Sequence, residues 1–222
     1  MKIVNFTKML FKAKKQKIFC IGQNKTGTTS LEKFFIDHGY KVGNQEKAEL
    51  FMDDYIQRNW KPILKYCETA EVFQDIPFSN DYLYVLLDYH FPNAKFILSE
   101  RETPEDWYNS ITKFHAKLFG KEGRIPTKED LLKAKYRYEG FLWKSFEEKF
   151  GEINGDIYNK EHLIKKYLER NKQIKHYFKN KSNFLTVNLS DNNSVQLLAT
   201  FLNIKPKYEQ MPWENKTEPT TK

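Results

Sequence analysis

A nine-residue segment between an apolar run and an amphipathic stretch constrains the fold more than any other part of the chain. Residues 22–30 read Gly-Gln-Asn-Lys-Thr-Gly-Thr-Thr-Ser; they follow the apolar run 18–21 and precede 31–36, where apolar residues recur at helical spacing. A buried strand, a glycine-containing loop and a helix N-terminus direct free backbone N–H groups and the positive end of the helix dipole at one spot. Lys25 adds a positive charge there. We therefore predict an anion site for a phosphate or sulfate group.

The loop is not a Walker A motif. That motif requires glycine, four residues and then Gly-Lys-Ser/Thr, whereas Lys25 precedes Gly27 by two residues. The run Lys-Thr-Gly-Thr-Thr-Ser-Leu instead resembles the 5′-phosphosulfate loop of the sulfotransferases that use 3′-phosphoadenosine 5′-phosphosulfate. The alternative is a glycine-containing turn with a chance lysine. The residues that the resemblance implies for binding the phosphosulfate are Lys25, Thr26, Gly27, Thr28, Thr29 and Ser30.

Strand-like and helix-like segments alternate along the chain. Strands are expected at 18–21, 40–42, 72–73, 95–99 and 184–187, and helices at 31–36, 45–66 with a break at 60–62, 80–91, 104–118, 128–149, 161–178 and 194–202. This order predicts an α/β fold, a three-layer open parallel sheet flanked by helices, and the resemblance implies that it is like that of the P-loop NTPases. Ligands of such sheets bind beyond the carboxyl ends of the strands. Thr29 and Glu32 fit a helix capping box.

A second anion-binding pair follows the clearest strand. Arg101 ends that strand, Pro104 suits the first turn of the next helix, and Ser110 lies nine residues after the arginine. A guanidinium binds phosphate through two parallel hydrogen bonds, and a hydroxyl adds a donor. This segment resembles the family's 3′-phosphate site, which implies that Arg101 and Ser110 hold that phosphate. The commoner spacing is eight, so Asn109 is an alternative to Ser110, and a surface salt bridge is the alternative for Arg101.

Asp75 is the candidate catalytic base. Cytosolic members of the family carry Lys-Thr-His-Leu-Pro near the end of this strand, and residues 73–77 here read Phe-Gln-Asp-Ile-Pro. The resemblance implies that Asp75 stands in the place of the histidine. A carboxylate accepts a hydroxyl proton at about 2.6–3.2 Å; burial would raise its pKa, and Lys25 would lower it. A turn-capping role for Asp75 stays open, and so does His115 as the base.

The rest of the chain is less specific. The length of 222 residues suits a single domain, 1–222. We divide it into a basic lead-in (1–16), a helical segment that suits acceptor recognition (112–182) and a tail (205–222). The resemblance extends to Pro-x-x-Asn-Lys at 212–216, which implies that Lys216 closes over the cofactor.

Composition limits the function classes. The 37 basic residues outnumber 29 acidic ones, which favours an anionic partner without identifying it. Two cysteines are too few for a disulfide framework, and five scattered histidines give no metal-ligand spacing, so we expect no metal. No apolar run approaches the length of a membrane span or a secretory leader, which favours a cytoplasmic protein. Peripheral membrane contact through residues 3–11 stays open.

The resemblance implies a sulfotransferase that moves a sulfuryl group from 3′-phosphoadenosine 5′-phosphosulfate to an acceptor hydroxyl on a carbohydrate, a lipid or a small molecule. The carboxylate in place of the histidine and the late Pro-x-x-Asn-Lys segment resemble bacterial and carbohydrate-type members. Two other functions stay open. A kinase would need Gly-Lys-Ser/Thr, which the chain lacks. A polyanion-binding module would rest on basic patches alone, and because no nucleic-acid motif is present we expect no nucleic-acid partner.

Overall fold

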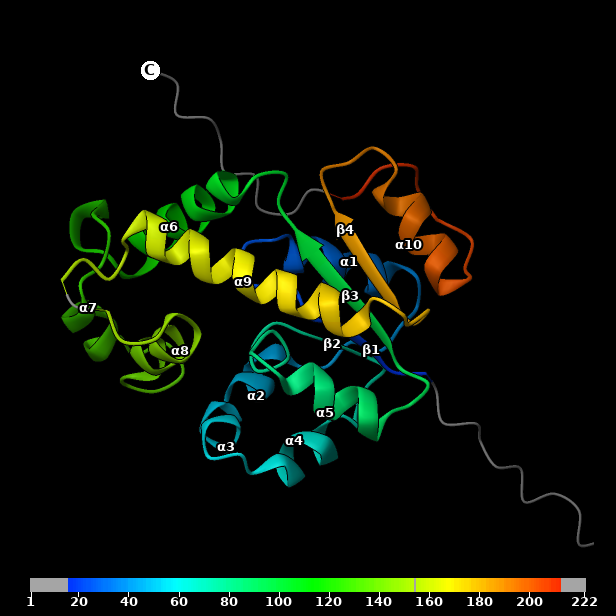
Figure 1. The fold of residues 1–222 in the computed structure, drawn as a ribbon, viewed down its shortest axis with the longest axis horizontal. Coiled ribbons are helices and arrows are strands. Elements are labelled where there is room, and N and C mark those ends of the chain that lie inside the picture. Colours follow the sequence, from blue (N-terminus) through cyan, green and yellow to red (C-terminus); the bar gives the residue numbers. More distant parts are fainter. Residues whose placement is uncertain (1–15, 154, 213–222) are drawn as a thin grey trace, which may run out of the picture.

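The computed structural model describes residues 16–153 and 155–212. Its centre is a four-stranded, fully parallel sheet with the order β2-β1-β3-β4 (Figure 1). The strands are β1 (Ile18–Cys20), β2 (Val72–Gln74), β3 (Lys95–Glu100) and β4 (Phe184–Asn188). The strand expected at 40–42 forms only an isolated bridge, between Val42 and Val72.

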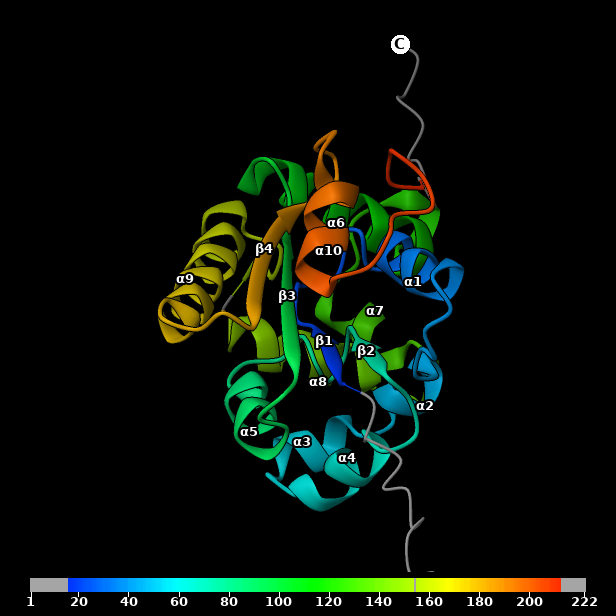
Figure 2. The same ribbon diagram turned by 90° about the vertical axis from the view of Figure 1, so that its right-hand side faces the viewer.

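Helices cover both faces of the sheet, which confirms the predicted three-layer α/β fold. One face packs against α1 (Thr28–Asp37) and α10 (Ser194–Leu202). The other face packs against α2 (Gln45–Glu49), α3 (Met52–Ile56), α4 (Trp60–Tyr66), α5 (Leu83–His90) and α9 (Lys160–Phe178). Figure 2 shows α1 and α10 in the upper half of the molecule and α3, α4 and α5 in the lower half.

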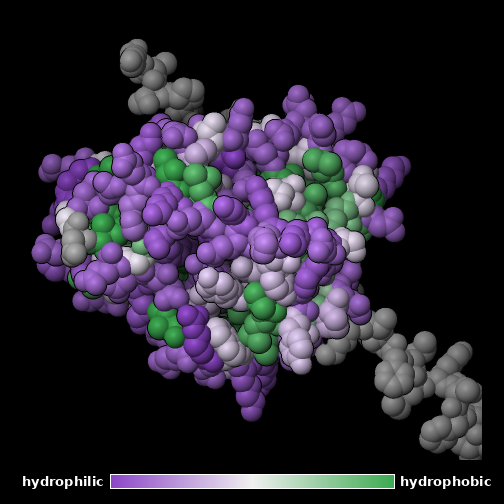
Figure 3. All heavy atoms as spheres, viewed as in Figure 1, coloured by the Kyte–Doolittle hydropathy of each residue, from purple (hydrophilic) through white to green (hydrophobic). Residues whose placement is uncertain are grey.

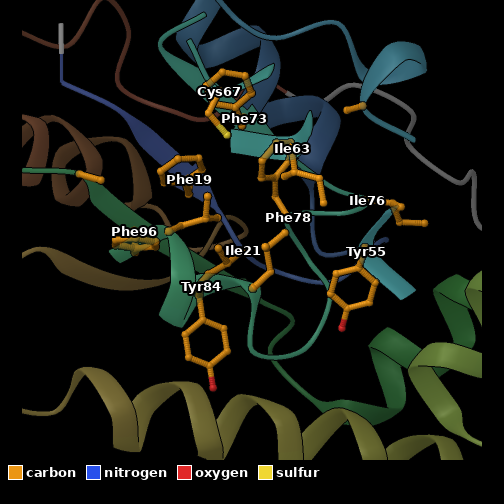
Figure 4. Close-up of a cluster of buried hydrophobic side chains, with 14 of the residues drawn as sticks. Phe19, Ile21, Tyr55, Ile63, Cys67, Phe73, Ile76, Phe78, Tyr84 and Phe96 are labelled. Atoms are coloured by element: carbon orange, nitrogen blue, oxygen red, sulfur yellow. The ribbon is translucent and has the colours of Figure 1, made fainter. Parts of the chain in front are cut away.

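The alternation of side chains along β1 explains the two cores. Phe19 points to one face, whereas Ile18 and Cys20 point to the other. The Phe19 ring is fully buried and lies 5.5–5.8 Å, centroid to centroid, from the rings of Phe73, Phe78, Phe91 and Phe96. Figure 4 shows Phe19, Phe73, Phe78 and Phe96 of this cluster close together. Because β1 is buried on both faces, it reads as an unbroken apolar run.

A third core holds the remaining helices beyond one end of the sheet. It joins α6 (Pro104–Phe119), α7 (Lys128–Lys133) and α8 (Phe141–Phe150) to α9, with a 3-10 turn, η1 (Lys121–Gly123), between α6 and α7. Trp107 of α6 stacks on Tyr167 of α9 at 4.4 Å and 7°. This stack fixes α6 and α9 against each other.

The predictions of two long helices are wrong. Residues 128–149 form α7 and α8 instead of one helix, and Gly140, with φ of 84°, starts α8. Residues 45–66 form three short helices, and the chain breaks at Arg58, whose φ is 58°. Pro62 lies in the first turn of α4, where a proline needs no N–H partner, so it does not break the helix.

The surface in Figure 3 is mostly hydrophilic, with apolar side chains gathered in small separate areas. Among the described residues, no helix is both long enough and apolar enough to span a membrane. Ligands of open parallel sheets bind at the carboxyl edge. In this protein the ends of the neighbouring strands β2, β1 and β3 meet at that edge.

Candidate active site

The N-terminus of α1 is open toward the loop. Gly27 is the N-cap, with φ of 96°, and no side chain caps the helix. The first N–H groups of a helix have no partner inside it, and the first turn of α1 carries no acidic residue. The expected Thr29–Glu32 capping box is absent, because α1 starts at Thr28 and the Glu32 carboxylate accepts a hydrogen bond from Gln74 (3.2 Å). The helix therefore presents its amides at the predicted anion site.

The loop is held in shape through its carbonyl groups. The Thr26 hydroxyl donates to the Gln23 carbonyl (2.6 Å), and the Trp107 indole N–H donates to the Asn24 carbonyl (3.1 Å). The Thr26 hydroxyl also lies 2.7 Å from that of Ser99 on β3, and Thr26 is buried. Thr26, predicted to bind the phosphosulfate, thus has its hydroxyl engaged inside the protein. Thr28 is half-buried, Thr29 is exposed and Ser30 is buried.

The loop can leave β1 only because its first residue is a glycine. A Cβ atom at Gly22 would lie 2.2 Å from the Ser99 hydroxyl and 2.6 Å from the Ser99 carbonyl oxygen. Real Cβ atoms do not approach other atoms so closely, so the first loop residue packs directly on β3. The Ile21 N–H bond to the Ile97 carbonyl (2.8 Å) maintains this contact.

The structure brings Arg101 and Ser110 together and joins them to the loop. The Arg101 Nε atom donates to the Lys25 carbonyl at 2.7 Å, and Nη2 lies 3.5 Å from the Ser110 hydroxyl. Arg101 is half-buried, and burial lowers its pKa. A guanidinium has five N–H donors and stays charged, so Arg101 retains donors for a ligand. Asn109, the alternative partner, is exposed.

Lys25 is coupled to Arg101 and to Asp75, the residue that follows β2. Its Nζ atom is 4.0 Å from the centre of the Phe114 ring of α6, and its φ is 68°. Burial lowers the pKa of Lys25, Arg101 lowers it further, and Asp75 opposes these two effects. Lys25 therefore interacts electrostatically with both Arg101 and Asp75.

Asp75 turns out of β2 with φ of 55°, and its Oδ1 atom accepts the N–H of Ile76 at 2.8 Å. Burial raises the pKa of Asp75, while Lys149, the Ile76 N–H and Lys25 oppose that rise. A carboxyl with a raised pKa is better matched to proton transfer near neutral pH than an ordinary aspartate.

Lys149 is a residue of this site that the sequence analysis missed. It projects from α8, donates a hydrogen bond to the Asn24 side chain and acts on Asp75. Burial lowers the pKa of Lys149 to about 8. One signal was present in the sequence: Lys149 lies three residues after Phe146 and four after Ser145, on the buried stripe of α8.

His115, the alternative base, has a different environment. Its Nδ1 atom is 2.6 Å from the Tyr158 hydroxyl. Burial lowers the pKa of His115 to about 3, and Lys149 and Lys25 contribute to the shift. The imidazole is therefore neutral at physiological pH and a weak proton acceptor. Lys216, the predicted late cation, lies outside the described residues.

A family model described as a sulfotransferase domain covers residues 17–220, which is nearly all of the chain. No curated protein matches the chain significantly.

Proposed function

Because the chain belongs to the sulfotransferase domain family, we propose that it transfers a sulfuryl group from 3′-phosphoadenosine 5′-phosphosulfate to an acceptor hydroxyl. One observation carries this choice of donor: Arg101 reaches the Lys25 carbonyl with one nitrogen and Ser110 with another. The open N-terminus of α1 and the Arg101–Ser110 pair are thus neighbouring anion sites. Two neighbouring sites suit a nucleotide with separate 5′ and 3′ phosphates.

The residues divide the work of the transfer. The amides of Thr28, Thr29 and Ser30 hold the 5′-phosphate, and Arg101 with Ser110 holds the 3′-phosphate. Asp75 accepts the proton of the acceptor hydroxyl while its oxygen forms the new bond to sulfur. Lys25 and the helix amides stabilise the negative charge on the departing phosphate oxygen. Lys149 supplies a second cation beside Asp75.

Asp75 is a better base than His115 in this arrangement. Burial brings the pKa of Asp75 up toward neutral pH, whereas the pKa of His115 falls to about 3. Efficient general bases have a pKa near the working pH. Asp75 also follows β2 directly, next to the strand that carries the loop.

A thermal-shift comparison of nucleotides tests the proposed donor. Adenosine 3′,5′-bisphosphate at about 100 times its Kd should stabilise the fold by about 2.7 kcal/mol, which raises Tm by roughly 5–10 °C in a chain of this size. ADP and ATP with magnesium should give smaller shifts. Stabilisation by ATP with magnesium alone would instead favour a kinase.

Replacing Arg101 by alanine should weaken binding of adenosine 3′,5′-bisphosphate by about 10–100-fold, because a hydrogen bond to a charged group contributes about 1.5–3 kcal/mol. Calorimetric titration measures the Kd. Arg124→Ala is the matched control, since Arg124 pairs with Asp130 on the surface. Equal affinity in the Arg101 variant and the control would remove Arg101 from the site.

Activity should fall as the pH rises through about 8, because the Lys149 cation is lost there. The guanidinium of Lys149→Arg stays charged, so this variant should move the alkaline limb of the pH profile upward, and Lys149→Met should lower turnover at all pH values. Lys144→Met is the control on the same helix, where Lys144 pairs with Asp53. An alkaline limb that stays in place in Lys149→Arg would exclude Lys149 as its source.

A further inference from the structure

A mostly apolar cavity of about 70 Å³ lies between the loop, α6, α7 and α8. Its polar lining includes Asn24, Glu49, His115 and Lys149. Much of the rest is hydrocarbon, from Ile111, Phe114, Leu131, Phe141, Leu142 and Phe146. Most of the lining comes from the segment 112–182. The remainder is Gln23 and Asn24 of the loop, Glu49, Ile76 and Ile111.

The cavity is lined by residues that interact with the proposed catalytic base. Asn24 and Lys149 line it and hydrogen bond to each other through their side chains. Both also act on the Asp75 carboxyl and lower its pKa. Ile76, the residue after Asp75, lines the cavity as well. A molecule in this cavity would therefore lie beside residues that contact or adjoin Asp75.

Ser145 gives a second observation that points to a ligand. It lines the cavity from α8 and is 6% exposed, and its Oγ atom has no hydrogen-bond partner within residues 16–153 and 155–212. A buried hydroxyl without a partner is unfavourable by about 1–3 kcal/mol. The segments packed around it are otherwise largely apolar. Ser145 is thus placed to bind a polar atom of a molecule in the cavity.

We propose that this cavity binds the acceptor, and that the acceptor is a compact, mostly apolar alcohol or phenol with a second polar atom that binds Ser145. The inference rests on the proposed function. A cavity of about 150 Å³ holds benzene, so the cavity of about 70 Å³ here encloses only part of one ring, whose outer edge reaches beyond it. A sugar would lose water from several hydroxyls against hydrocarbon, which is unfavourable without partners.

In the proposed reaction, the bond that forms at sulfur is matched by one that breaks. The acceptor oxygen bonds to sulfur and gives its proton to Asp75. The bond between sulfur and the phosphate oxygen of the donor breaks, and its electron pair stays on that oxygen. No other reactant is needed.

Calorimetric titrations with phenol, catechol, resorcinol and hydroquinone test the inference, with the protein saturated with adenosine 3′,5′-bisphosphate. At least one dihydroxybenzene should bind about 3–10-fold more tightly than phenol, because one hydrogen bond is added. Ser145→Ala should remove that gain and leave the affinity for phenol unchanged. Methyl glucoside should bind at least tenfold more weakly than phenol. Dihydroxybenzenes that bind no better than phenol, or a gain that survives in Ser145→Ala, would overturn the role of Ser145.

A blocking variant tests the location. Leu142→Trp fills the cavity and should weaken phenol binding by tenfold or more, whereas Leu132→Trp, at an exposed position of α7, should leave it unchanged. Equal loss in both variants, or no loss in either, would overturn the location. Titrating the bisphosphate alone, and the phenols with and without it, separates the two proposals. Bound bisphosphate without bound phenols contradicts only the acceptor inference, and bound phenols without bound bisphosphate contradict the proposed donor.

Discussion

Replacing Lys25 by methionine is expected to lower turnover by about 10²–10³-fold while the protein stays folded. A preorganised group that stabilises developing charge typically contributes this much, and Lys25 is the cation of the loop itself. Methionine keeps the packing on Phe114, which Lys25 contacts at 4.0 Å. The measurement is transfer of radiolabelled sulfuryl groups from the donor to acceptors, with Tm of the same samples.

Lys33→Met is the matched control for Lys25. Lys33 lies on α1, the helix that follows the loop, and forms a surface salt bridge with Asp37. Because an exposed pair of this kind contributes little to stability, the control should keep normal turnover and Tm. Near-normal turnover in Lys25→Met would contradict the proposed stabilisation of the leaving group. A large fall in Tm would show that Lys25 has a structural role instead.

Replacing Asp75 by asparagine is expected to lower turnover by about 10²–10⁴-fold, the usual contribution of a general base. Asparagine keeps an oxygen that can accept the Ile76 N–H, which now bonds to Asp75 at 2.8 Å. The local backbone should therefore be preserved, and only the proton-accepting group is lost. The same transfer assay measures the effect, and Asp54→Asn is the control.

The same substitution should raise Tm at neutral pH. Burial raises the pKa of Asp75 in the folded protein, so the ionised carboxylate is less favourable in the folded than in the unfolded chain. The stabilising contribution of the protonated Asp75 carboxyl is full below the unfolded pKa of about 3.9. This contribution is lost as the pH rises through the folded pKa. Melting curves at acidic and neutral pH test this sign. Lower turnover with lower Tm at neutral pH would point to disrupted packing rather than a lost base.

Local patterns in the sequence predicted the four strands of the sheet and the loops that converge at its carboxyl edge. Gly22, Asp75 and Arg101 each follow a short apolar strand closely, and parallel neighbours bring such positions to one edge. Local signals also set the start of α6. Thr103 caps the helix by accepting the Asp106 N–H, and Pro104 is its first residue. These features depend on residues close together in the chain.

The missing parts depend on contacts between distant segments. Lys149 reaches Asn24 only because α8 packs on α6 and α9, and nothing near position 149 names that partner. The position of Ser145 in the cavity depends on the same packing of α8. The Thr26 hydroxyl is engaged because Ser99 of β3 lies beside it. The capping box failed because Gly27 adopts a left-handed conformation and is the N-cap in place of Thr29, so α1 starts two residues earlier than expected.

The structure of the complex with adenosine 3′,5′-bisphosphate tests the central claim most directly. We expect the 5′-phosphate on the amides of Thr28, Thr29 and Ser30, and the 3′-phosphate within hydrogen-bond distance of Arg101 and Ser110. A nucleotide bound at another face, or one that leaves both the α1 N-terminus and Arg101 without a phosphate, would contradict the account.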